Sequence, residues 1–401
     1  MRAAGVSPDP SIPIALQERP SIIYLTVPVV TVNVRPTMSL FRRRKPIDLR
    51  SIDARRICLI KPSAFGDVVQ TLPLLPVLRE RFPNATISWA INRGLADLID
   101  GHPQLDQIIP IDRGASLNGW RKLVSQLRRQ RFDLVFDLQG LLRTAVMTAA
   151  TRAPLRVGLE TAREGSHLAC HVLLSDTGKQ VPAHLRYWKV AEALGMGRFR
   201  RETTVPIRPD EHAWATDRLQ PLAGRVLAIH PGARWVTKRW PAERFAVVAA
   251  KARRVFGLTT VLVGSRDELP FALQVEHLLK RFTPSAPVIN LAGQTSLRQL
   301  AAVLKQSLVL LSNDSGPMHL AAGLGTPVVG IFTCTSPQRS GPPGPLHELV
   351  STQVACAASY KKHCPFRGDK HMACLEEIEI ERVWAAVVRV LEKQGITNRA
   401  A

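Results

Sequence analysis

The chain has 401 residues, of which 54 are Lys or Arg and 32 are Asp or Glu, giving a net charge of +22. This length accommodates two ordinary domains, and the charge favours an anionic partner: a nucleic acid, an acidic membrane surface, or a phosphorylated or carboxylated substrate. Aromatic residues make up only 5% and do not alternate with basic ones, which disfavours nucleic acid, and six cysteines are too few for a disulfide scaffold, which fits a reducing cytoplasm.

The first 50 residues differ in composition from the rest. Residues 21–34 are apolar but contain Pro28, and they fall short of the roughly 20 residues of a membrane-spanning helix. They also lack the basic start and cleavage site of a signal peptide. We therefore predict that residues 1–50 form a disordered extension. Met38, followed by the basic run 42–45, is an alternative start that would make residues 1–37 an artefact of start assignment.

From Arg56 onward, apolar strand patterns alternate with helical patterns, which predicts an α/β fold with mainly parallel sheets. In the first half, strands are expected at 57–61, 86–91, 107–111, 134–138 and 156–159, and helices at 68–82, 118–130, 141–151 and 184–194. An Arg- and Pro-rich segment then interrupts the pattern. We place a linker there, at 201–224, between domains at 51–200 and 225–377.

The alternation resumes in the second half, and a helix is expected after each of its first four strands. These strands are expected at 225–230, 260–264, 287–291, 307–312 and 327–332. Apolar residues at helical spacing between 378 and 391 predict a final amphipathic helix that docks onto the body. Two similar α/β halves would direct their ligand-facing loops into a cleft between them.

The first strand-to-helix junction carries Gly66 and Asp67. It lies at the carboxyl end of a strand, the edge where open α/β sheets bind ligands. Because unpaired amides and the helix dipole stabilise an ionised carboxylate at a helix start, Asp67 is predicted to be charged and to face a ligand. The alternative is a helix cap without chemistry.

A matching junction follows the strand at 307–312, where Asp314, Ser315 and Gly316 lead into a helix that contains His319. Amides at a helix start have no partner within the helix, so Ser315 and Gly316 are predicted to bind a diphosphate. The alternative is an ordinary capped helix with a surface histidine.

The loop after the strand at 225–230 contains Gly232 and Lys238. Glycine lets a ligand approach the backbone, and lysine can neutralise a phosphate as a point charge. After the next strand, Glu268 is a candidate acceptor for a ribose hydroxyl, or it merely favours a helix start. For the loop, the alternative is that Trp235 and Trp240 pack and the basic side chains are solvated.

Several fingerprints are absent from the sequence: a GxGxxG after a strand, a P-loop, and an Asp-x-Asp. Their absence disfavours dinucleotide oxidoreductases, NTPases and metal-bridged nucleotide-sugar sites, and it favours a leaving diphosphate neutralised by Lys238 and helix amides. Cys356, Cys364 and Cys374 are not spaced as CxxC pairs, so packing is favoured over zinc binding.

The order of these motifs resembles glycosyltransferase family 9, the ADP-heptose:lipopolysaccharide heptosyltransferases, particularly those that add the first heptose to Kdo on lipid A. The resemblance covers roughly residues 56–391 and is carried by IKPSAFGDVV at 60–69, DLQGLLR at 137–143, GLETARE at 158–164, HPGA at 230–233 with KRWP at 238–241, and NDSGPMH at 313–319. It implies a GT-B architecture of two Rossmann-like domains with parallel sheets facing a central cleft. The first domain would bind the acceptor and the second the nucleotide sugar, with the helix in 378–401 packing back toward the first domain.

The same resemblance assigns roles to individual residues. Asp67 matches the proposed general base, Lys238 the lysine on the donor phosphates, and Glu268 the acid near the adenosine ribose. The implied donor site consists of Gly232, Lys238, Glu268, Asp314, Ser315, Gly316 and His319. The implied acceptor site consists of Ser63, Gly66, Gln139, Arg143 and Arg163.

The expected enzyme inverts the anomeric configuration and needs neither a cofactor nor a metal, although a divalent cation can assist. Its expected partners are ADP-heptose, a Kdo-lipid A type acceptor and the anionic inner face of the inner membrane, but not nucleic acid. It is expected to be a cytoplasmic protein that associates peripherally with that membrane. Two alternatives stay open: a family 9 enzyme with another acceptor or sugar, and a noncatalytic basic protein that binds membrane or nucleic acid.

Overall fold

The computed structural model describes residues 34–36, 47–112, 114–222 and 225–397, and the statements below concern these residues. The strands of a first sheet are β1 (Val34–Pro36), β2 (Arg56–Ile60), β3 (Thr86–Asn92), β4 (Gln107–Ile111), β5 (Leu134–Asp137), β6 (Leu155–Leu159) and β7 (Val172–Leu174). The strands of a second sheet are β8 (Val226–His230), β9 (Thr259–Leu262), β10 (Val288–Asn290), β11 (Val309–Asn313), β12 (Val328–Phe332) and β13 (Glu348–Ser351). All ten predicted strands are present within two residues at either end, and β1, β7 and β13 were not predicted.

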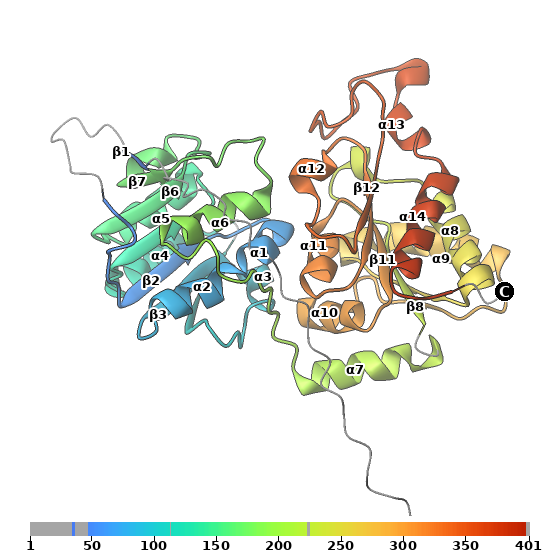
Figure 1. Cartoon of the computed structure of the whole chain (residues 1–401), viewed down its shortest axis with the longest axis horizontal. Helices are drawn as coiled ribbons and strands as arrows, with labels where there is room; N and C mark the ends of the chain where they lie inside the picture. The colour runs from blue at the N-terminus through green and yellow to red at the C-terminus, as the bar shows by residue number, and fades with distance from the viewer. Residues whose placement is uncertain (1–33, 37–46, 113, 223–224, 398–401) are drawn as a thin grey trace, which may run out of the picture. The chain divides into compact units, whose positions relative to one another are not determined.

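Helices connect the strands in both halves (Figure 1). Those of the first half are α1 (Phe65–Thr71), α2 (Leu74–Arg81), α3 (Arg93–Ala96), α4 (Leu117–Arg129), α5 (Leu142–Ala150), the 3-10 helix η1 (Ser166–Ala169) and α6 (Ala183–Ala193). Those that follow are α7 (Pro209–Leu219), α8 (Ala242–Phe256), α9 (Leu269–Phe282), α10 (Leu297–Lys305), α11 (Gly316–Gly323), α12 (Pro337–Ser340), α13 (Ala373–Glu376) and α14 (Ile380–Glu392). The remaining 3-10 helices are η2 (Gln220–Leu222), η3 (Val236–Lys238), η4 (Arg266–Glu268) and η5 (Gly368–Lys370).

Both sheets have the strand order of a Rossmann-like fold. The order is β1-β7-β6-β5-β2-β3-β4 in the first sheet and β10-β9-β8-β11-β12-β13 in the second. All pairs are parallel except β1 with β7. The chain direction across the sheet reverses between β2 and β5 and between β8 and β11, and these reversal points are where such sheets bind ligands.

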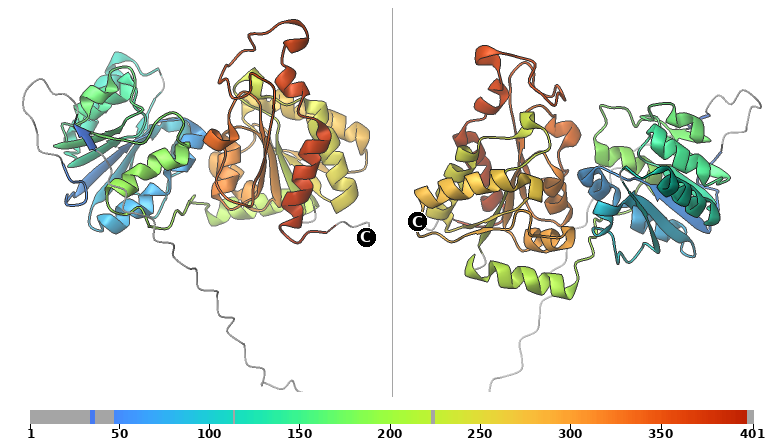
Figure 2. Two further views of the ribbon diagram at one scale, coloured as in Figure 1. Left: turned by 45° about the horizontal axis from the view of Figure 1, so that its top comes forward. Right: turned by 180° about the vertical axis from the view of Figure 1, so that it is seen from behind.

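Each sheet is buried on both faces, which explains the continuous apolar runs of its strands. In β2, Ile57 and Leu59 join the core beneath α1, α2 and α6, while Cys58 and Ile60 join the core beneath α4 and α5. The second sheet is covered by α10 and α11 on one face and by α8, α9 and α14 on the other. Figure 2 shows helices on both faces of each sheet.

The helix predicted at 68–82 is two helices, α1 and α2. Pro73 lies between them and has no amide hydrogen to continue the first helix. α1 begins at Phe65, so Asp67 is its third residue and does not precede the helix. Ala64 is the extended residue before the helix, and its amide donates to Asp67 Oδ2 at 3.2 Å. Asp67 therefore satisfies a helix-start amide, as the capping interpretation proposed.

The final helix does not pack toward the first domain as the resemblance implied. α14 packs against α8 and against β11, β12 and β13. Its apolar face, including Val383, Val387 and Val390, lies in the core on one side of the second sheet. Burying that face covers β-strands that would otherwise be exposed to water, so the expected packing was wrong for residues 380–392.

Two other predictions need correction. The linker predicted at 201–224 contains the helix α7, which packs against α10. Residues 34–36 of the predicted disordered extension form β1, and Leu49 is buried in the core. Residues 1–33 and 37–46 lie outside the described residues. Among the helices that are described, none has the length and hydropathy needed to cross a bilayer.

Candidate active site

Most of the predicted site residues lie at the two reversal points, whereas Glu268, after β9, and Arg163, after β6, each lie one strand away. Asp67 follows β2 and Gln139 follows β5, which are neighbours in the first sheet. Lys238 follows β8 and Asp314 follows β11, which are neighbours in the second sheet. Each pair of loops therefore shares the carboxyl edge of adjacent strands, where both halves of a ligand site are expected.

Asp67 accepts hydrogen bonds at both carboxylate oxygens. Oδ2 accepts from Lys61 Nζ at 3.4 Å and from the Ala64 amide at 3.2 Å, while Oδ1 accepts from the Tyr187 hydroxyl at 3.0 Å. The Lys61 side chain is 3% exposed and that of Asp67 is 34% exposed. The carboxylate is thus held from the protein side and remains open to a ligand.

These contacts determine the charge of the carboxylate. Burial alone would favour the neutral acid, but the Lys61 charge and the hydrogen bonds from Ala64 and Tyr187 outweigh it and lower the pKa of Asp67. Burial raises the pKa of Tyr187, which stays a hydrogen-bond donor, and lowers the pKa of Lys61. Asp67 is therefore ionised at neutral pH.

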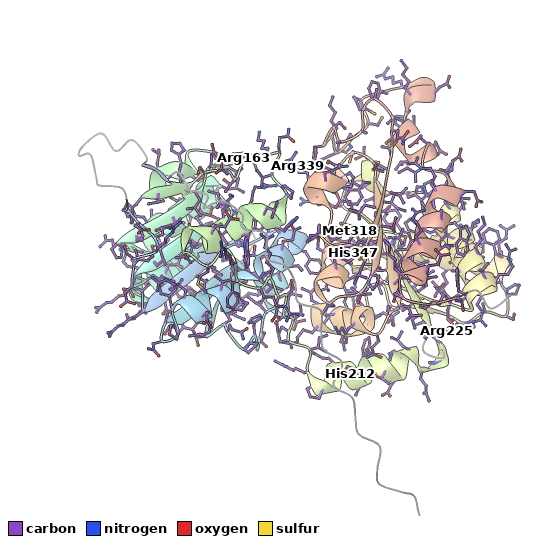
Figure 3. The ribbon with its side chains drawn as sticks, in the orientation of Figure 1. Arg163, His212, Arg225, Met318, Arg339 and His347 are labelled. Atoms are coloured by element: carbon purple, nitrogen blue, oxygen red, sulfur yellow. The ribbon has the colours of Figure 1, made fainter. Side chains whose placement is uncertain are left out.

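Two of the predicted acceptor residues join this network. Gln139 Oε1 accepts from Lys61 Nζ and from the Ser63 amide, each at 3.3 Å. Arg143 and Arg163 are exposed, and neither side chain makes a hydrogen bond or ion pair with any other described residue. The Arg163 amide, on the loop after β6 (Figure 3), donates to the Gly140 carbonyl at 2.9 Å. The two arginines thus flank the Gln139 loop without contacting Asp67.

Lys238 is paired with the second junction. Its Nζ donates to Asp314 Oδ2 at 2.7 Å and to the Asp314 carbonyl at 3.4 Å, and it lies 4.8 Å from the centre of the Trp235 ring. The Asp314 side chain is 6% exposed and that of Lys238 is 16% exposed. The lysine is thereby pre-positioned beside the start of α11.

His230 connects the remaining donor residues. Its Nδ1 lies 3.0 Å from Ser315 Oγ and its Nε2 lies 3.2 Å from Glu268 Oε2. The network is satisfied when Nε2 donates to the carboxylate and Nδ1 accepts from the serine. Burial alone would raise the pKa of Glu268. The hydrogen bonds that its carboxylate accepts from His230 and from the Ser265 amide outweigh burial and lower the pKa to about 2. A Cβ on Gly232 would lie 2.6 Å from the Glu268 carboxylate, so any larger residue at 232 would have to displace the end of the glutamate side chain.

The two junctions meet where α1 packs against α11. A Cβ on Gly66 would lie 2.5 Å from His319 Cδ2, and a Cβ on Gly316 would lie 2.2 Å from Phe65 Cδ1. Gln70 Nε2 also lies 3.1 Å from His319 Nδ1. His319 is therefore a buried contact residue and not a surface histidine, and its burial lowers its pKa and keeps it neutral.

A cavity of about 230 Å³ borders this contact. Its walls include Gln70, His184, Trp188, Arg201 and His319, so His319 alone among the predicted site residues lines it.

Three contributors were not predicted: Lys61, Tyr187 and His230. The role of Lys61 could have been predicted from the sequence, because a lysine at the end of a buried strand needs a counter-charge nearby. Tyr187 lies 120 residues from Asp67 in the sequence, and no local pattern connects them.

The C-terminal cysteines lie near one another: burial raises the pKa of Cys374 to about 11, and the neighbouring Cys356, Cys334 and Cys364 add to the rise. Among the described residues, no group of three or more His, Cys, Asp or Glu side chains is arranged to hold a metal ion. Cys374 is buried, while Cys356 and Cys364 are partly buried, and all three are free thiols.

Two Rossmann-like sheets with polar strand-to-helix junctions are the architecture of a GT-B glycosyltransferase. The family model described as glycosyltransferase family 9 (heptosyltransferase) matches residues 120–369, more than half of the chain. The protein therefore belongs to glycosyltransferase family 9.

Curated relatives and solved structures agree with this family. The chain is 27% identical to a lipopolysaccharide core heptosyltransferase of Haemophilus influenzae, covering 74% of this chain and 84% of the relative. It is also 27% identical to lipopolysaccharide heptosyltransferase 1 of Pseudomonas aeruginosa, covering 82% and 92%. The structure of ADP-heptose lipopolysaccharide heptosyltransferase II from E. coli is similar in fold, with a TM-score of 0.69 at 22% identity over 85% of this chain and 99% of that one.

Proposed function

We propose that this enzyme transfers heptose from ADP-heptose to the Kdo or inner-core region of a lipopolysaccharide precursor, with inversion at the anomeric carbon. Family membership and the curated relatives, which are lipopolysaccharide heptosyltransferases, support the donor and the acceptor class. The observation that carries the proposal is the contact of the two junctions: Gly66 against His319 and Gly316 against Phe65. This contact brings the helix start that bears Asp67 to the helix start that bears the donor loop.

Asp67 acts as the general base in this proposal. Oδ2 already accepts from Lys61 and Ala64, whereas Tyr187 is the one donor to Oδ1 among the described residues, so Oδ1 is the atom best able to take a proton. The acceptor hydroxyl attacks the anomeric carbon as ADP leaves, and its proton passes to Oδ1. A carboxylate with a lowered pKa is a weak base, so the transfer occurs late, when the attacking oxygen has become acidic.

The leaving diphosphate is stabilised from the second domain. Lys238 supplies a positive charge, and the start of α11 supplies the Ser315 and Gly316 amides, neither of which donates a hydrogen bond within the described chain. Because Asp314 already pairs with Lys238 at 2.7 Å, the diphosphate must share the lysine with that carboxylate. Glu268 accepts a ribose hydroxyl, and its lowered pKa keeps it an acceptor.

The acceptor is assigned to the first domain. Arg143 and Arg163 are exposed and lack ion-pair partners among the described residues, which suits them to the acidic groups of a Kdo-containing acceptor. The absence of an Asp-x-Asp motif supports a reaction without a resident metal ion. The same acceptor would place the enzyme at the cytoplasmic face of the inner membrane.

A matrix of donors and acceptors, followed by mass spectrometry of the products, tests this function. Purified enzyme is incubated with ADP-heptose, ADP-glucose or UDP-glucose and with Kdo-lipid A, or with the same lipid already carrying one heptose. Addition of one heptose only with ADP-heptose and Kdo-lipid A, in the presence of EDTA, is the expected result. Transfer only to the heptosylated lipid, or only from another donor, would assign a different family 9 reaction.

A further inference from the structure

A group of apolar side chains on the first domain is exposed in the part of the chain that the structure describes. Nine large apolar residues are strongly exposed in the described chain, and four of them gather around α5. Their exposed fractions are 79% for Leu117, 58% for Leu142, 47% for Val146 and 75% for Leu168. We call these four residues the α5 patch.

The four residues lie on elements that pack against one another. Leu142 and Val146 are four residues apart on α5 and share a helix face, and α5 packs against both η1, which carries Leu168, and α4, which begins at Leu117. The Leu142 amide donates to Glu164 Oε2 at 3.0 Å, which ties the start of α5 to the loop before η1.

The α5 patch contributes nothing to the core. α5 packs through a different face, where Thr144, Ala145, Met147 and Thr148 are buried. Exposing several leucines costs solubility without stabilising the fold, so a cluster of this kind indicates a binding surface.

Basic side chains surround the patch. Arg143 follows Leu142 on α5, Arg121 is one turn beyond Leu117 on α4, and Arg163 lies on the loop before η1. All three are exposed, and none forms an ion pair with another described residue. Residues 121–131 contain five basic residues and no acid. The surface thus combines protruding aliphatic groups with uncompensated positive charge.

We propose that the α5 patch docks on an anionic lipid bilayer, with its aliphatic side chains in the acyl boundary and the surrounding arginines at the headgroups. Aliphatic groups and flanking basic residues are the two signals that together give stable interfacial binding. Four aliphatic side chains are far fewer than the about 20 residues per partner of a stable dimer. The proposal extends the proposed function, because α5 starts just after Gln139 and would face the membrane that holds a lipid-anchored acceptor.

Vesicle flotation with the full chain tests this surface. Binding is measured to vesicles of phosphatidylcholine alone and of phosphatidylcholine with phosphatidylglycerol. Wild type should bind the anionic vesicles more tightly, and the double substitution Leu142→Ser with Leu168→Ser should weaken that binding at least about tenfold. The matched control is Leu273→Ser on α9, since Leu273 is 49% exposed and lies outside the patch; it should bind as wild type does.

Equal vesicle binding by wild type and the double variant overturns the proposal. So does a double variant that dissociates a wild-type dimer in light scattering while binding vesicles normally, since the patch would then hold a second copy. Arg121→Gln should also weaken binding to anionic vesicles, and no change there contradicts the electrostatic part. Flotation needs no sugar donor, so loss of binding in the double variant supports the surface even if heptose transfer is never detected.

Discussion

Replacing Lys61 by methionine is expected to raise the pKa of Asp67 without changing the shape of the site. Lys61 is buried, and its Nζ lies 3.4 Å from Asp67 Oδ2. Methionine fills a similar volume and removes the charge, so Asp67 loses its nearest cation but keeps the hydrogen bonds from Ala64 and Tyr187. Because the proposed base must be deprotonated, the acidic limb of the rate profile moves to higher pH.

The distance sets the size of this shift. At this separation, Coulomb's law gives about 1.2 kcal/mol in bulk water and about 5 kcal/mol at an effective dielectric constant of 20. The Asp67 side chain is 34% exposed, so solvent screens the pair and the lower part of the range applies. We expect about 1.4 to 2.8 kcal/mol, which corresponds to a rise of about one to two pH units.

The assay is ADP release at saturating ADP-heptose and acceptor, measured from acidic to neutral pH. The matched control is Lys251→Met, which removes a lysine paired with Glu381 on α14, away from the site. Its profile should coincide with that of wild type. A folded Lys61→Met enzyme whose acidic limb does not move would refute the assignment of Asp67 as the titrating base or of Lys61 as the group that tunes it.

Three further outcomes are expected. Gly316→Ala places a methyl 2.2 Å from the Phe65 ring and should lower kcat/KM about tenfold, and adding Phe65→Ala should restore much of the rate. Arg298→Met removes the charged partner of the buried Glu211, at 2.6 Å, and leaves it the hydrogen bond from the Arg208 amide, so the free energy of unfolding in urea should fall by about 3 kcal/mol. The pKa of Glu268 is lowered from 4.5 to about 2, so the ionised side chain stabilises the fold fully above pH 4.5, and this stabilisation is lost as the pH falls toward 2. In thermal melts, Glu268→Gln should remove up to about 3 kcal/mol of the loss of stability that wild type shows between these pH values.

Each of these has a clear contrary result. An unchanged rate for Gly316→Ala would show that the Phe65 contact is not part of the active conformation. Urea curves for Arg298→Met that match wild type would show that the ion pairs contribute nothing net. An identical acid transition in Glu268→Gln would assign the loss of stability to other carboxylates.

The strand and helix alternation could be predicted because parallel strands buried on both faces are continuous apolar runs with polar turns between them. β2, with four buried residues in a row, is an example. Strand length alone does not decide which strands could be predicted, because β7 was missed although β10, also of three residues, was predicted. The packing of α14 could not be predicted from its sequence. An amphipathic helix has an apolar face, but its sequence does not say which sheet that face covers.

The candidate site also has residues that could be predicted from the sequence and contacts that could not. The junction residues Asp67 and Asp314 could be placed from the strand-to-helix pattern alone, and their roles stay predictions. The Tyr187 contact with Asp67 and the packing of Gly66 against His319 could not, because both join segments far apart in the chain. Such contacts depend on how helices pack, which local sequence does not encode.

The rate of heptose transfer by Asp67→Asn tests the central claim most directly. Asparagine keeps the size of the side chain but cannot take the acceptor proton, so kcat should fall at least about 100-fold while ADP-heptose binds with unchanged affinity. Asp112→Asn, at a surface ion pair with Arg93, is the matched control and should retain the wild-type rate. Product formation by Asp67→Asn within a few-fold of wild type would contradict the account.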